Sequence, residues 1–179
     1  MKDGEVILRE LNDLFSALDD GAAAQTAAAV ASHARVFVCG AGRSGLMLRA
    51  FAMRLAQMGK TVFVAGDTVT PAIRRGDLLL AASASGTTGG VVRNAETARA
   101  VGADLLVLTA SPDAPLASMA TSGTVVLPAA TKDCAGASSQ VMGSLFEQAV
   151  LLFGDAVIAR LVSASGDAKQ MRARHANLE

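Results

Sequence analysis

The stretch Val36-Phe37-Val38-Cys39-Gly40-Ala41-Gly42-Arg43-Ser44-Gly45 passes from a run of apolar residues directly into a glycine-rich turn. A short β-branched and aromatic run is typical of a buried strand, and glycines permit a tight turn behind it. We therefore expect a strand over 35–39, a loop over 40–45 and a helix over 46–58. A strand followed by a helix is the repeating unit of a parallel α/β sheet.

The same alternation continues along the chain. The further expected strands are 61–65, 78–82, 104–109 and 124–127, and the further expected helices are 5–19, 22–32, 89–101, 138–162 and 169–174. Short apolar strands that alternate with helices predict βαβ units. We expect an α/β fold of three α/β/α layers, with a five-stranded parallel sheet of the flavodoxin-like type and additional N-terminal helices.

Length and composition limit the possibilities further. The 179 residues suit a single domain over 1–179, with a helical N-terminal extension over 1–34 and a C-terminal tail over 165–179. Aromatic residues make up only 3%, which argues against stacking platforms for single-stranded nucleic acid. Sixteen basic residues balance sixteen acidic ones, so the chain lacks the positive field that attracts nucleic acid or anionic membranes.

The remaining composition predicts a cytoplasmic protein without a metal site. The N-terminus has no signal-peptide pattern, and Glu147, Asp155 and Arg160 interrupt the longest apolar region, 141–162. That region predicts a buried or interface helix rather than a membrane span. Cys39 and Cys134 lack the spacing of a zinc site.

The turn 40–45 has the properties of an anion site. Its glycines let a ligand approach the backbone, the following helix offers unpaired N–H groups, and Arg43 and Ser44 add donors. The turn also matches the G-x-G-x-x-G dinucleotide pattern, with Asp67 about 20 positions further on. On this turn alone, a dinucleotide site and an ordinary βα turn both remain open.

The loop Ser83-Ala84-Ser85-Gly86-Thr87-Thr88 favours a phosphate ester instead. Its four hydroxyls before a helix can form a compact cage for a terminal phosphate, which a dinucleotide fold does not need. A plain helix cap is the alternative, but one cap uses one hydroxyl. With 40–45 and 66–71, this loop should lie beyond the carboxyl ends of the strands, where ligands bind in such sheets.

Two further residues are candidates for proton transfer. Glu147 lies near the start of a long apolar helix, where it either stabilises the helix N-terminus or acts as a base in a cleft. His175 lies in a polar tail, where most histidines are simply solvated. His33 has no partner pattern, and we expect it to be structural.

These residues together resemble the SIS (sugar isomerase) domain family, and within it the 6-phospho-3-hexuloisomerases. The resemblance runs from about residue 5 to the C-terminus. The loops 40–45 and 83–86 indicate the broad family, whereas 142–148 and 174–179 are typical of the hexuloisomerases. The chain departs from the pattern at Thr87, where an acidic residue is expected, and this places the substrate specificity in question.

The resemblance implies interconversion of D-arabino-3-hexulose 6-phosphate and D-fructose 6-phosphate through a cis-enediolate, with no cofactor and no metal. The pathway would be ribulose monophosphate fixation of formaldehyde, with hexulose-phosphate synthase as the neighbouring enzyme. Another sugar-phosphate isomerase, or a non-catalytic sugar-phosphate-binding domain, stays open as an alternative.

The resemblance also implies roles for residues. Glu147 would be the base and His175 would move a proton between the two oxygens. The phosphate would be held by Arg43, Ser44, Ser83, Ser85, Thr87 and Thr88. A homo-oligomer, tetramer or dimer, would share its sites between subunits, so that the tail 165–179 reaches an active site.

Overall fold

The computed structural model describes residues 2–131, 138–166 and 168–178. The helices are α1 (Asp3–Ser16), α2 (Ala22–Ser32), α3 (Gly42–Gln57), α4 (Gly89–Ala100), α5 (Pro115–Ser118), α6 (Ser144–Ser165) and α7 (Ala168–Ala173). The strands are β1 (Arg35–Gly40), β2 (Thr61–Val64), β3 (Leu78–Ala82), β4 (Asp104–Thr109) and β5 (Thr124–Val126).

The strands form one parallel sheet in the order β2-β1-β3-β4-β5. From β1 the chain moves outward to β2, then crosses back to place β3 on the other side of β1. The strand order therefore reverses between β1 and β3, which is the switch point where ligands bind in open α/β sheets. The predicted five-stranded, flavodoxin-like α/β fold is confirmed.

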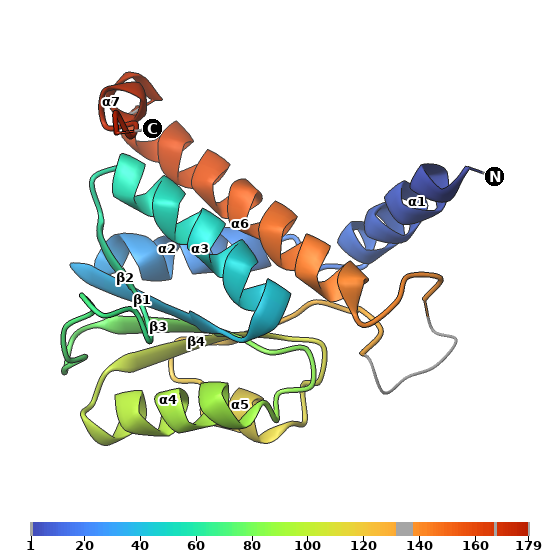
Figure 1. The fold of residues 1–179 in the computed structure, drawn as a ribbon, viewed down its shortest axis with the longest axis horizontal. Helices are drawn as coiled ribbons and strands as arrows, with labels where there is room; N and C mark the ends of the chain where they lie inside the picture. The colour runs from blue at the N-terminus through green and yellow to red at the C-terminus, as the bar shows by residue number, and fades with distance from the viewer. Residues whose placement is uncertain (1, 132–137, 167, 179) are drawn as a thin grey trace.

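Helices cover both faces of the sheet, as Figure 1 shows: α2, α3 and α6 lie over one face, and α4 and α5 over the other. Alternate side chains of β1 point to opposite faces of the sheet and pack in the cores on its two sides. Val36 and Val38 pack in the core on the α3 and α6 side, whereas Phe37 and Cys39 pack in the core on the α4 side. This alternation explains why β1 is an unbroken apolar run, since both of its faces are buried.

The helix α3 begins at Gly42, four residues before the expected start at 46, so the last four of the six residues of the predicted loop 40–45 are helical. The early start brings the first turn of α3 directly against the end of β1. A Cβ atom at Gly45 would lie 2.5 Å from the carbonyl oxygen of Gly40. Only glycine therefore permits this approach of helix to strand.

The helix α6 begins at Ser144 rather than at 138, because two left-handed residues precede it. Met142 has φ 57° and Gly143 has φ 78°, and neither conformation continues a right-handed helix. At its other end α6 extends to Ser165, three residues beyond the expected limit. The short helix α5 was not predicted from the sequence.

A buried ion pair lies at the amino-terminal ends of β1 and β3, at the other end of these strands from the glycine turn 40–45. Asp77, which is 3% exposed, accepts hydrogen bonds from Arg35 Nε at 2.8 Å, from Arg35 Nη2, and from the Arg74 N–H at 2.8 Å. These contacts, led by the Arg35 hydrogen bond, lower the pKa of Asp77. Asp77 is therefore ionised in the folded protein at neutral pH.

We predict that Asp77→Asn lowers the free energy of unfolding by about 3 kcal/mol at neutral pH, because it leaves the Arg35 charge without its partner. Since folding lowers the Asp77 pKa, the pair stabilises the fold above the unfolded pKa of about 3.9 and is lost as the pH falls through the folded value. Urea unfolding at pH 7 and at decreasing acid pH measures both effects. Asp113→Asn, at an exposed position, is the control; an equal effect at both sites contradicts the prediction.

Candidate active site

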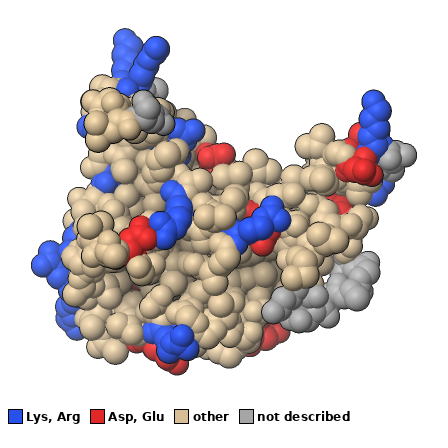
Figure 2. All heavy atoms as spheres, in the orientation of Figure 1, with Lys and Arg blue, Asp and Glu red and all other residues tan. Residues whose placement is uncertain are grey.

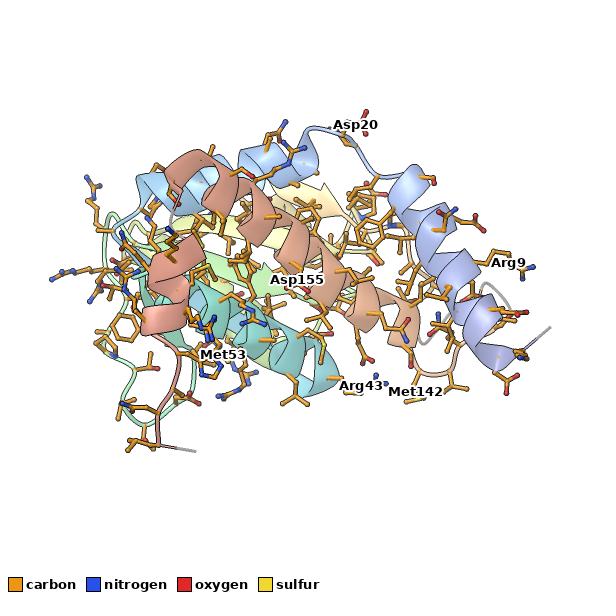
Figure 3. The ribbon with its side chains drawn as sticks, turned by 90° about the horizontal axis from the view of Figure 1, so that it is seen from above. Arg9, Asp20, Arg43, Met53, Met142 and Asp155 are labelled. Carbon is orange, nitrogen blue, oxygen red and sulfur yellow. The ribbon has the colours of Figure 1, made fainter. Side chains whose placement is uncertain are left out.

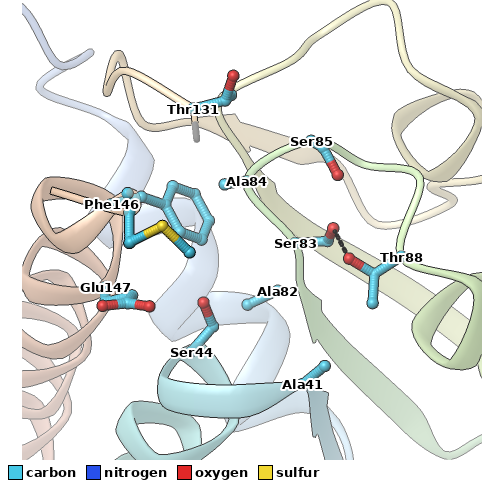
Figure 4. Close-up of a pocket in the computed structure, with 12 residues that line it drawn as sticks. Ala41, Ser44, Ala82, Ser83, Ala84, Ser85, Thr88, Thr131, Phe146 and Glu147 are labelled. Carbon is cyan, nitrogen blue, oxygen red and sulfur yellow. Dashed lines mark hydrogen bonds between the residues drawn. The ribbon is translucent and has the colours of Figure 1, made fainter. Parts of the chain in front are cut away.

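Three helix N-termini converge on one cavity of about 150 Å³ beyond the carboxyl ends of β1 and β3 (Figure 4). The residues that precede α3, α4 and α6 are Ala41, Thr88 and Gly143, and all three line this cavity. None of them caps its helix through a side-chain hydrogen bond. The positive ends of three helix dipoles and their backbone N–H groups are thus directed at one space, which suits an anion.

Hydroxyl groups form a wall of the cavity where β3 ends and α3 begins. Ser83, Ser85 and Thr88 follow β3, and Ser44 lies in the first turn of α3. Ser83 Oγ lies 2.9 Å from Thr88 Oγ1 and accepts the N–H of Gly86 at 3.1 Å, so the loop is held in shape by its own hydroxyls (Figure 4). Four hydroxyls beside three helix starts provide the short, multiple hydrogen bonds that a phosphate monoester accepts.

Thr87 lies outside this wall. Its side chain is exposed, its hydroxyl donates to Ser85 Oγ at 3.0 Å, and it does not line the cavity. The residue at the position of the expected acid therefore contacts a cage residue instead of facing the space that the cage encloses.

Glu147 forms part of the opposite wall, in the first turn of α6. Its side chain is 15% exposed, and its Oε2 atom lies 3.1 Å from Arg43 Nη1. Oε2 is buried and its contact with Arg43 is an ion pair without hydrogen-bond geometry, while the same Arg43 nitrogen donates to Ser144 Oγ at 3.2 Å. The carboxylate is therefore paired electrostatically in the wall of the cavity.

Arg43 thus has a different neighbour from the one that the sequence suggested. It was expected to contact the anion directly, whereas its guanidinium lies against Glu147 and Ser144, with a side chain that is 56% exposed. Figure 3 shows Arg43 and Met142 at the same end of the molecule, where α3 and α6 begin. A positive group beside the carboxylate can also stabilise negative charge that develops on a bound substrate.

The structure does not bring His175 to the cavity of its own chain. His175 follows α7, at the far end of α6 from Glu147 (Figure 1). A helix of 22 residues spans about 33 Å. The neighbouring Arg174 donates to the carbonyl of Gln57 at 3.3 Å, which fixes the tail beside the C-terminal end of α3.

The structure argues against the dinucleotide site that the turn 40–45 left open, because the acidic residue of that pattern lies away from the cavity. Asp67 accepts two hydrogen bonds from Arg49, at 2.6 and 2.9 Å, and does not line the cavity. The loop 66–71 therefore contributes no residue to the lining of the cavity.

Thr131 and Phe146 also line the cavity, and neither was predicted from the sequence. The position of Thr131 after β5, at the same sheet edge, was the signal that could have indicated it.

Metal-ligand clusters and membrane-spanning helices are both absent from the described residues. Among residues 2–131, 138–166 and 168–178, no group of three His, Cys, Asp or Glu side chains could hold a metal ion. None of the helices in these ranges combines the length and the apolar composition of a transmembrane segment. Cys39 is buried, and burial raises the pKa of its thiol, whereas Cys134 lies outside the described residues.

Comparison with known proteins agrees with this geometry. The SIS domain model matches residues 30–152. The 3-hexulose-6-phosphate isomerase of Mycobacterium gastri is 49% identical over 173 residues, covering 95% of this chain and 86% of that protein. The 3-hexulose-6-phosphate isomerase of Bacillus subtilis (strain 168) is 38% identical over 177 residues, covering 97% and 95%.

A solved structure extends the likeness to three dimensions. It is a hypothetical protein of Methanococcus jannaschii, for which a molecular function of 3-hexulose-6-phosphate isomerase was inferred from its crystal structure. That protein matches with a TM-score of 0.87 and 26% identity, covering 100% of both chains. Since the family model spans most of the sequence and the relatives align almost end to end, the chain belongs to the SIS domain family.

Proposed function

We propose that the chain is an isomerase that interconverts D-arabino-3-hexulose 6-phosphate and D-fructose 6-phosphate. The observation that carries the proposal is the carboxylate of Glu147 in the wall of a cavity formed by three helix N-termini and four hydroxyls. Relatives that are 49% and 38% identical over nearly the whole chain carry the name of this activity.

The reaction transfers one proton between neighbouring carbons. In the hexulose, C3 is the carbonyl and C2 carries a hydrogen and a hydroxyl; in fructose 6-phosphate, these positions are exchanged. A base removes the C2 proton to give an enediolate across C2 and C3, and the proton returns at C3 while the hydroxyl proton passes from O2 to O3. Atoms and electrons balance within the substrate, so the conversion calls for no external oxidant or reductant.

We assign the proton transfer between carbons to Glu147. Its carboxylate lines the cavity and its side chain is only 15% exposed, so it can meet a substrate bound there with little competition from water. The Arg43 guanidinium, 3.1 Å from Oε2, is placed to stabilise the enediolate charge. One positioned base contributes roughly 10²–10⁴-fold to the rate.

The hydroxyl wall takes the phosphate. Ser44, Ser83, Ser85 and Thr88 hold the C6 end, which leaves C2 and C3 to extend toward Glu147. Thr87 acts on this wall only through its hydrogen bond to Ser85. The absence of an acid at position 87 therefore leaves the phosphate cage intact.

We infer that a second copy of the chain completes the site and supplies His175. The cavity of about 150 Å³ is below the roughly 300–1,000 Å³ that is usual for small-molecule pockets. The outer side of α3 and α6 exposes Leu46, Met53 and Leu152, at 56%, 49% and 41%, and Figure 2 shows a mostly uncharged face on which a few Lys or Arg side chains lie beside Asp or Glu. Such a surface suits a homo-oligomer, a dimer or tetramer, in which the tail 165–179 reaches a neighbouring site.

The wider context follows from the same assignment. A substrate with a carbonyl at C3 and phosphate at C6 arises when formaldehyde is added to ribulose 5-phosphate, so hexulose-phosphate synthase is the enzyme that supplies it. The single domain over 1–179, the ribulose monophosphate pathway and the cytoplasmic location stay predictions.

We predict that Glu147→Gln reduces kcat by at least about 10²-fold while the Kd for fructose 6-phosphate changes by only a few-fold, because the amide keeps its shape but cannot accept the proton. A coupled assay with formaldehyde, ribulose 5-phosphate and a synthase measures turnover, and calorimetry measures binding. Glu96→Gln, on the exposed side of α4, is the matched control. Near-normal turnover in Glu147→Gln would refute the assignment of the base.

Thr88→Val should weaken binding of fructose 6-phosphate by about 10-fold or more, because a hydrogen bond to a charged group contributes roughly 1.5–3 kcal/mol. Thr87→Val, with the same change of atoms one residue away, should weaken it by less than about 3-fold, because Thr87 does not line the cavity. Calorimetric Kd values for the pair decide the matter. Equal losses would place the phosphate elsewhere.

Mixing two inactive variants tests whether sites are shared. Glu147→Gln and His175→Ala should each have low activity alone, but random mixing of their subunits should restore about a quarter of the wild-type rate in a dimer. The restored sites combine Glu147 from one subunit with His175 from the other. If mixed oligomers form, as mass spectrometry can verify, and activity does not return, His175 does not act across the interface.

A further inference from the structure

We propose that Glu10, on the N-terminal helix α1, is a positioning residue that holds the segment 138–140 and thereby fixes the turn from which α6 and Glu147 begin. The proposal rests on the proposed function, because it deepens the role of Glu147 in that site. It gives α1, which lies outside the sheet and its flanking helices, a specific task in catalysis.

The contacts of Glu10 are concentrated on three consecutive residues that are far away in the sequence. Its Oε2 accepts hydrogen bonds from Ser138 Oγ at 2.7 Å and Gln140 Nε2 at 3.0 Å, and its Oε1 accepts the N–H of Ser139 at 2.7 Å. Distances this short are typical of hydrogen bonds to an ionised acceptor. One carboxylate thus binds backbone and side chains of the whole segment.

The charge of Glu10 is stable over the pH range in which enzymes work. The backbone hydrogen bond from Ser139, followed by the side chains of Gln140 and Ser138, lowers the pKa of Glu10 to about 2. Glu10 therefore stays ionised at neutral pH, and its contacts are not a pH switch.

The segment that Glu10 holds leads directly into a turn with an unfavourable backbone. Met142 has φ 57°, a left-handed conformation that residues other than glycine rarely adopt, and Gly143 follows with φ 78°. Such a conformation persists where neighbouring contacts over-determine it. The side chain of Met142 is 77% exposed, so packing of that side chain does not fix the turn.

The turn connects to the catalytic wall through a short series of contacts. Met142 and Gly143 line the cavity themselves. Ser144 Oγ donates to the carbonyl of Val141 at 2.8 Å and accepts from Arg43, whose Nη1 also pairs with Glu147. A shift of the turn would therefore move Ser144, Arg43 and the first turn of α6 together.

The docking of α1 itself depends on other residues. Leu11 and Leu14 are the buried residues of α1, at 9% and 3% exposure, and both belong to the core on the α6 side. Removal of the Glu10 carboxylate deletes no apolar surface from that core. A loss of activity without a matching loss of stability is therefore the signature that separates positioning from a general structural role.

The test uses Glu10→Ala, with Asp13→Ala as a control that removes an exposed acid from the same helix. Glu10→Ala should lower kcat about 10- to 100-fold, because misplacement of a reacting group by about 1 Å has an effect of this size. KM should rise by less, since the hydroxyl wall at 83–88 is not touched. The melting temperature of Glu10→Ala should be only a few degrees below that of Asp13→Ala, because the hydrogen bonds are lost but no apolar surface is removed from the core. Glu10→Gln, which retains one acceptor oxygen, should lie between Glu10→Ala and the wild type in kcat.

Two further measurements isolate the mechanism. Amide hydrogen exchange of peptides covering 138–147 should accelerate in Glu10→Ala and not in Asp13→Ala. In a Glu147→Gln background, Glu10→Ala should cause little additional loss of kcat, because the residue on which it acts is already removed. Full additivity of the two substitutions, unchanged exchange, or parallel losses of activity and melting temperature would each overturn the proposal.

The exchange measurement also separates this proposal from the assignment of the reaction. If the wild-type protein failed to turn over the hexulose phosphate, the proposed function would be wrong. The hold of Glu10 on 138–140 would still be tested by exchange, because that measurement needs no substrate and follows the backbone of 138–147 directly.

Discussion

The site depends on one constraint: three helices must begin at the same point beyond the sheet. The strand order places β1 and β3 side by side while α3 and α4 leave on opposite faces, so their N-termini meet at the switch point. The third helix, α6, reaches this point because its start is set by the turn at 141–143. Since none of the three uses a side chain as its cap, their N–H groups make a preformed place for a doubly charged anion.

The close contact of Gly45 with Gly40 allows α3 to begin at this point. The first turn of α3 lies against the end of β1 because Gly45 leaves room for the carbonyl of Gly40, and a methyl group there would collide with it. That approach places Ser44 in the cavity and directs Arg43 across to Glu147. The glycines of this turn thus serve the geometry of the catalytic wall as much as the contact with a phosphate.

Most of the fold follows from the sequence because the strands are continuous apolar runs and the helices between them are bounded by glycines. The strands over 35–39 and 78–82 could be predicted for this reason. The start of α6 was not readable, because a left-handed methionine looks the same as a helical one in a sequence. Local pattern also grouped Thr87 with its neighbours Ser85 and Thr88, whereas the direction of each side chain is decided by the path of the loop.

Contacts between residues that are distant in the sequence could not be predicted from it either. Neither the contact of Arg43 with Glu147 nor that of Glu10 with 138–140 leaves a periodic signal, because each joins elements that only tertiary folding brings together. Yet these two contacts set the charge and the geometry of the cavity wall that carries Glu147. In the proposed function the hydroxyl loops would hold the phosphate, but a phosphate site alone has no means to move a proton. The acidic side chain on α6, with a cation beside it and a turn held from α1, is the feature that would distinguish a catalyst from a simple sugar-phosphate receptor built on the same sheet.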